Sequence, residues 1–178
     1  VARVVMKSIR DLVVGEKPYC AAVEKLDSVD AALAETQRFL SYVVSSPDAS
    51  QVHSQHLGVL HAMEHLTRLV EACRELDNVR TTAHSDYLRM LTLNQLKEFD
   101  MVIRWLDGEI PEAPLKNVEQ ISTMFAETRR KKRTDMIGNI AQGGLKPEEG
   151  FEHLEAMRWI DRIAYHIWRS IYHLGQKH

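Results

Sequence analysis

Apolar residues recur at helical spacing along the whole chain, and glycine and proline separate the segments that carry them. Near the carboxyl end, for example, Met157, Ile160, Ile163, Ile167 and Ile171 fall on one face of a helix. No segment alternates apolar and polar residues as a half-buried strand does. Long amphipathic helices with short connections pack as antiparallel bundles, so we predict an all-α bundle of about five long helices with a short N-terminal helix.

Capping and turn residues place the predicted helices along the chain. A short helix ends at Gly15 and Pro18, and a linker leads to a second helix capped by Asp27 or Ser28. Further helices are expected from Pro47 to about Asp77, from Ser85 to about Leu106 before Gly108, from Leu115 to Gln142, and from Pro147 onward. We therefore divide the chain into an N-terminal helix and linker, residues 1–25, and a helical bundle, residues 26–178.

The composition argues against several classes of protein. A net charge of -2 offers no basic footprint, so we expect no nucleic-acid partner. Charged residues break every apolar run short of the roughly 20 residues that a membrane-spanning helix needs. Cys20 and Cys73 have no metal or redox spacing; we expect free thiols in a reducing compartment, and a disulfide is the alternative.

Two of the helical segments resemble each other. Residues 60–69 align with residues 154–163, and leucine, alanine, methionine and arginine occupy matching positions, including Arg68 and Arg162. Two core helices can converge on such a pattern, because most of these residues are common helix formers. The matching arginine favours duplication of a helical unit, since packing alone does not require it. The sequence leaves both explanations open.

The segment Asp161–His166 (Asp-Arg-Ile-Ala-Tyr-His) resembles the signature of the PhoU family, which regulates phosphate uptake. The repeat places a first copy of this signature at Thr67–Ala72. In that family, two acids four residues apart in each copy share a helix face and hold a metal cluster. Here each copy keeps one acid, Glu71 or Asp161, and a tyrosine or threonine replaces the other. The resemblance implies a divalent-metal site reduced to Glu71 and Asp161.

The resemblance also implies a function. PhoU-like domains occur alone and as the cytoplasmic tail of bacterial sodium/phosphate cotransporters, and the start at Val1 and the divergent metal motif favour the tail. Residues 26–178 would then form a non-enzymatic regulatory domain of phosphate transport. Its expected partner is the transmembrane transport domain of the same polypeptide, at the cytoplasmic side of the inner membrane; a lone domain would be cytoplasmic. A homodimer is a further candidate assembly.

Basic side chains supply candidate contacts for an anion or a partner. The candidates are Arg68, Arg158, Arg162, His166 and Arg169. Guanidinium groups suit phosphate geometry, whereas the simpler alternative is a charged surface with local pairs such as Arg158 with Asp161. A separate basic run, consisting of Arg129, Arg130, Lys131, Lys132 and Arg133, is either solvated or in contact with anionic lipid at about 1 kcal/mol per residue.

Four histidines, His53, His56, His61 and His65, fall in one predicted helix. His61 and His65 are one turn apart, which suits a bidentate metal pair, although a solvated face is the simpler explanation. No zinc-protease motif, nucleophile elbow or glycine-rich phosphate loop occurs, so we expect no enzymatic activity. The alternatives to a regulatory domain are a metal-binding bundle that uses this helix and a structural dimerisation module.

Overall fold

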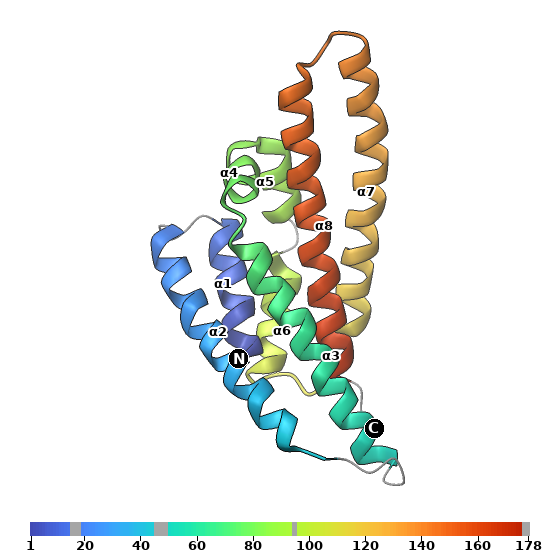
Figure 1. The fold of residues 1–178 in the computed structure, drawn as a ribbon. Coiled ribbons are helices and arrows are strands. Elements are labelled where there is room, and N and C mark those ends of the chain that lie inside the picture. Colours follow the sequence, from blue (N-terminus) through green and yellow to red (C-terminus); the bar gives the residue numbers. More distant parts are fainter. Residues whose placement is uncertain (15–18, 45–49, 94–95, 176–178) are drawn as a thin grey trace.

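The computed structural model describes residues 1–14, 19–44, 50–93 and 96–175. These residues form eight α-helices and no strand, which confirms the all-α prediction (Figure 1). The helices are α1 Ala2–Val14, α2 Tyr19–Tyr42, α3 Ser50–Cys73, α4 Leu76–His84, α5 Asp86–Leu93, α6 Leu96–Leu106, α7 Leu115–Ala141 and α8 Pro147–Gly175. No helix in these ranges is both long and apolar enough to cross a membrane.

Helix α8 is the central element of the bundle. It packs along α7 on one side and α3 on another, and it also contacts α4 and α5 (Figure 1). Helix α1 packs against α2, α3, α4, α5 and α6. The turn between α7 and α8 projects beyond the other helices, so the end of this hairpin extends past the bundle (Figure 1).

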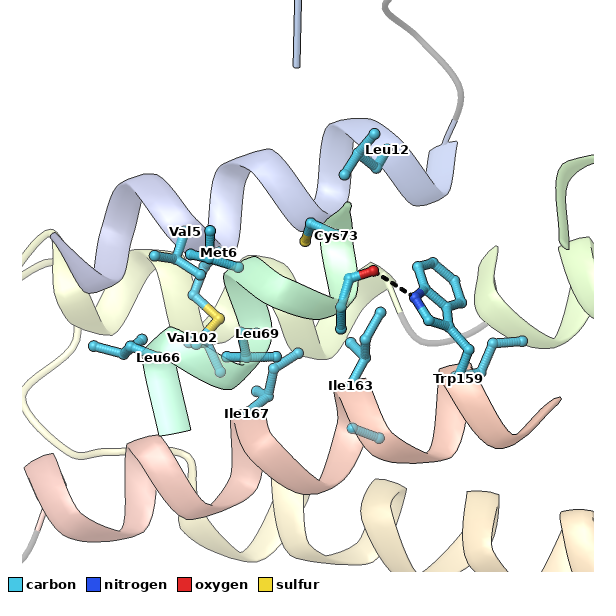
Figure 2. Packing of buried hydrophobic residues seen from close by; sticks show 14 of the residues in the cluster. Val5, Met6, Leu12, Leu66, Leu69, Cys73, Val102, Trp159, Ile163 and Ile167 are labelled. Atoms are coloured by element: carbon cyan, nitrogen blue, oxygen red, sulfur yellow. Dashed lines mark hydrogen bonds between the residues drawn. The ribbon is translucent and has the colours of Figure 1, made fainter. Parts of the chain in front are cut away.

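The hydrophobic core lies where α1, α3, α6 and α8 meet (Figure 2). Met6 of α1 and Val102 of α6 are fully buried there, as is Leu69 of α3, and Ile163 and Ile167 approach from α8. Each such side chain contributes about 1.5–3 kcal/mol by leaving water. The predicted N-terminal segment thus shares the core of the bundle, and the predicted boundary at residue 25 falls inside α2.

Several predicted helix ends are confirmed, with recognisable capping geometry. Gly108 and Gly143 follow α6 and α7 with φ of 76° and 73°, a conformation in which glycine meets no Cβ clash. The amide of Gly143 donates to the Ile140 carbonyl and that of Gly144 to Asn139, which closes the last turn as a Schellman motif. Ser85 caps α5, because its Oγ accepts from the Leu88 amide at 3.4 Å.

Other predicted boundaries are wrong. Helix α2 begins at Tyr19, so Asp27 and Ser28 lie within it and cap nothing. The Asp27 carboxylate instead accepts a hydrogen bond from Arg74 at 2.7 Å. Helix α3 ends at Cys73 in a turn, and α4 follows as a separate helix.

The segment from Ser85 to Leu106 is likewise divided, into α5 and α6. Four helices of 24 residues or more therefore replace the five long ones expected. The predicted breaks at Gly15, Pro18 and Pro47 lie outside the described residues.

Candidate functional site

An open groove of about 820 Å³ runs between α7 and α8. Arginines of both helices line it, together with two acids: Arg129 and Arg133 come from α7, and Glu155, Arg158, Asp161 and Arg162 from α8. Four guanidinium groups against two carboxylates leave a formal excess of two positive charges. A concave surface of one sign attracts ligands of the opposite charge, here anions.

Ion pairs fix some of these arginines and leave others available. Asp161 pairs with Arg129 across the groove at 2.7 Å. Arg162 donates to both carboxylate oxygens of Glu75, at 2.5 and 2.6 Å. The Nη1 atom of Arg158 lies 3.7 Å from Oε1 of Glu155. Among the described residues, Arg133 has no acid within ion-pair distance, so its charge is the most available in the groove.

The groove is apolar toward the α7–α8 turn. Ile137 of α7 and Phe151 of α8 line it there and are 40% and 53% exposed. The Tyr165 ring lines it farther along α8. An arginine-lined surface with an exposed aromatic edge suits an anionic group that carries some apolar surface.

Glu71 and Asp161, which the resemblance implies as metal ligands, each hold an arginine. Glu71 accepts a hydrogen bond from Arg68, three residues earlier on α3, at 2.9 Å. Asp161 faces α7 and pairs with Arg129. In the described part of the chain, no three or more histidine, cysteine or acidic side chains gather in a way that could hold a metal ion. A metal at Glu71 and Asp161 stays a prediction.

The predicted anion contacts fall in different places. Arg158 and Arg162 line the groove, whereas Arg68, His166 and Arg169 do not. The Arg169 guanidinium lies over the rings of Trp168 and Tyr172, with its carbon 5.5 and 5.3 Å from their centroids. The predicted pair of Arg158 with Asp161 is wrong. Arg158 instead lies near Glu155 of α8, and Asp161 pairs with Arg129 of α7.

The basic run of α7 is distributed around the helix, as a run of five within a helix must be. Arg129 and Arg133 line the groove. Lys132 lies over the Tyr87 ring of α5, with 4.8 Å between its Nζ and the ring centroid. Arg130 and Lys131 are exposed. Contact of this run with anionic lipid stays a prediction, and it would have to use Arg130 and Lys131.

A second cluster of ionisable groups lies where α3 meets α8, and we call it the histidine row. It consists of His61 and His65 of α3 with His166 and His173 of α8. The His61 and His173 rings stack at 4.9 Å, His173 stacks on His65 at 5.8 Å, and the His65 ring lies 5.3 Å from His166. The Nδ1 atoms of His65 and His166 are 3.0 Å apart. The solvated face predicted for this helix is therefore wrong at His65, which is half-buried.

Burial favours the neutral form of three of these histidines, His65, His166 and His173. Desolvation, and next the charge of His166, lower the pKa of His65; desolvation and then Arg162 lower that of His166. The pKa of His173 falls to about 4, first by desolvation and then through Arg169. These imidazoles are uncharged at neutral pH, because their pKa values lie below the ordinary value of 6.5.

A further polar contact between α3 and α8 is structural. The indole of Trp159, 1% exposed, donates a hydrogen bond to the Ala72 carbonyl at 2.7 Å (Figure 2). Cys73 next to it is a buried free thiol, and desolvation raises its pKa to about 12, so it stays protonated. The side chain of Cys20 lies outside the described residues.

Sequence patterns alone missed how these groups combine. The basic run that contains Arg129 and Arg133 was interpreted as solvated or in contact with anionic lipid, and no sequence pattern singled out Glu75. Arg129 pairs with Asp161 and Glu75 pairs with Arg162, so both contacts join α8 to another part of the chain and no spacing along the sequence reveals them. No protein-family model, curated protein or solved structure matches this chain. The resemblance to the PhoU family therefore rests on the sequence motif alone.

Proposed function

We propose that this chain is a non-enzymatic regulatory domain of phosphate transport, in which the groove between α7 and α8 receives an anionic group. The observation that carries this proposal is the excess of arginine over carboxylate in one open groove. The motif resemblance supports the assignment to phosphate transport. The transmembrane transport domain of the same polypeptide would be the partner that responds.

Regulation requires a ligand that favours one of two arrangements of the domain. Arg133 and Arg158 line the groove from α7 and α8 respectively, and their like charges repel. An anion bound between them offsets this repulsion and draws the two helices together. The projecting end of the hairpin would thus change its shape with anion occupancy, where a partner domain can contact it.

Calorimetric titration of the purified chain with inorganic phosphate tests this proposal. We expect one site, and at least tenfold weaker binding in Arg133→Gln and Arg158→Gln, a loss of about 1.4 kcal/mol each. Arg89→Gln on α5 is the matched control, because Arg89 is an exposed arginine outside the groove. Sulfate in place of phosphate measures selectivity. Equal phosphate affinity in wild type and both groove variants, or no binding to wild type at millimolar phosphate, would rule the proposal out.

A further inference from the structure

The groove between α7 and α8 is lined at the spacing that helices use when they pack side by side. On α8 its lining includes a row of residues at alternating steps of three and four, namely Phe151, Leu154, Arg158, Asp161 and Tyr165. This is the a/d spacing of helices in coiled coils and bundles. The row is about 21 Å long, from the rise per residue of an α-helix.

Helix α7 borders the groove with a row of its own. Its members also follow one another at steps of three or four residues, and they are Ser122, Ala126, Arg129, Arg133 and Ile137. Every residue that lines the groove belongs to α7 or α8, so no other helix in the described ranges covers this side of the hairpin. Two antiparallel helices with such rows provide two sides of a three-helix packing arrangement.

The two rows are in register. Arg129 of α7 pairs with Asp161 of α8 across the groove. Because the helices are antiparallel, Arg133, one turn farther toward the α7–α8 turn, lies level with Arg158, about one turn before Asp161. The middle of the groove therefore carries two guanidinium groups, one from each helix.

The lining also has the composition of a protein interface. Arg133 and Arg158 lie in the middle, Ile137 and Phe151 toward the α7–α8 turn, and Tyr165 toward the other end. Arginine, tyrosine and phenylalanine are enriched at protein interfaces, whereas lysine is depleted. Among the described residues that line this groove there is no lysine. The composition thus favours a polypeptide occupant.

We propose that the groove is the seat of an acidic amphipathic helix of a partner protein. The apolar face of that helix packs on Phe151, Leu154 and Ile137, and its carboxylates pair with Arg133 and Arg158. Four arginines against two acids require a negatively charged occupant, and a second copy of this hairpin would bring arginines against arginines. The inference rests on the proposed function in one respect: the partner's carboxylates are an anionic group that the groove receives, and phosphate competes with them.

A synthetic helical peptide of about 16 residues, long enough to span the groove, tests the proposal. It carries leucines at steps of three and four residues with glutamates beside them, and the matched peptide has lysine in place of each glutamate. Fluorescence anisotropy of the labelled peptides measures binding to the full chain. We expect one acidic peptide per chain, and at least tenfold weaker binding of the lysine peptide.

Variants of the chain locate the binding surface. Phe151→Ser and Arg133→Gln should each weaken binding of the acidic peptide at least tenfold. Phe39→Ser on α2 and Arg89→Gln on α5 are the matched controls, because both residues are exposed and lie outside the groove. Equal binding of the acidic and lysine peptides, or unchanged affinity in both groove variants, would overturn the proposal.

A paramagnetic label on the acidic peptide gives a measurement on the wild-type chain. It should broaden the NMR signals of backbone amides in residues 122–137 and 151–165 and leave those of α2 sharp. Broadening confined to other helices would contradict the proposed seat. Phosphate that binds while the acidic peptide does not would overturn the partner helix and leave the proposed function in place. Peptide binding without phosphate binding would support the partner helix and rule out the phosphate proposal.

Discussion

Helix α8 meets its two long neighbours in different ways. Its contact with α3 is sealed from water: Trp159, Ile163 and Ile167 are buried there, and the Trp159 indole N–H donates a hydrogen bond to the Ala72 carbonyl (Figure 2). Against α7 it leaves a groove, where Arg158 and Tyr165 are exposed. A polar group buried away from water is costly unless it has a hydrogen-bond partner. A solvated groove, in contrast, tolerates a guanidinium without an ion-pair partner, such as that of Arg133. The two faces of one helix can therefore serve stability and binding separately.

The sealed contact should carry the larger share of stability, and Trp159→Ala tests this most strongly. It removes a fully buried indole and its hydrogen bond to Ala72. We expect a loss of about 3–5 kcal/mol in the free energy of unfolding, measured by urea denaturation. Trp168→Ala is the control, because the Trp168 ring is only partly buried, and about 1–2 kcal/mol is expected. Equal losses would contradict the comparison.

A side chain introduced at Gly150, near the apolar end of the groove, should push α7 and α8 apart and open the groove. A Cβ at this position would lie 2.6 Å from Ile140 Cδ1 of α7. Gly150→Ala should cost about 1–3 kcal/mol, and Ile140→Val, which removes that methyl, should restore most of it. Gly138→Ala on α7 is the control: nothing lies within 4 Å, so the helix gains about 1 kcal/mol. Thermal unfolding of Gly150→Ala, of Gly150→Ala combined with Ile140→Val, and of Gly138→Ala measures both effects.

Acid should weaken the sealed contact at the histidine row. His173 faces His61 and His65 of α3 and Arg169 of its own helix, and its pKa is lowered from 6.5 to about 4. A base with a lowered pKa stabilises the fold above its unfolded value, so this stability is lost as pH falls from 6.5 to 4.

His173→Gln should lose less Tm than wild type over this range, by about 2 °C because the ring is partly exposed. His153→Gln, whose Nδ1 lies on the Glu149 carbonyl outside the row, is the control. An identical pH profile for wild type and His173→Gln would show that the row does not titrate with folding.

The smallest expected effect concerns the ion pair across the groove. Asp161→Asn removes the partner of Arg129 and raises the groove's positive excess. We expect a stability loss below about 1 kcal/mol. Phosphate Kd should fall roughly threefold, on the order of 0.6 kcal/mol for one added charge at high dielectric. Glu152→Gln, outside the groove, should leave Kd unchanged. A weaker phosphate affinity in Asp161→Asn would mean that the aspartate positions Arg129 for the anion.

Local chemistry made much of the fold predictable. Helix α7 begins and ends within a residue of the predicted limits and α8 begins at the predicted Pro147, because Gly143 and Pro147 act through their own backbone. The start of α2 was missed for the opposite reason. Asp27 is as good a cap as Ser85, but a long-range partner, Arg74, takes its carboxylate while the helix continues through it.

The sites were less predictable, because their partners come from distant parts of the chain. Arg162 was recognised as a candidate anion contact, yet its bond to Glu75 depends on how α8 lies on the end of α3. His61 and His65 were recognised as a pair, but His166 and His173 join them only through antiparallel packing. A sequence pattern reports residues on one helix face; it cannot report which face of another helix covers them.

Two of the side-chain contacts between α3 and α8 correspond to each other through the internal repeat. In the alignment of the repeat, His65 corresponds to Trp159, and Ala72 corresponds to His166. Exchanging the two copies therefore turns the Trp159–Ala72 contact into the His65–His166 contact, and both exist. At the level of residue pairs, the two antiparallel helices correspond about a point near Leu69 and Ile163. The contacts themselves differ, because the Trp159 indole donates to a backbone carbonyl whereas His65 and His166 meet through their rings. One end has an indole and the other an imidazole, in equivalent places.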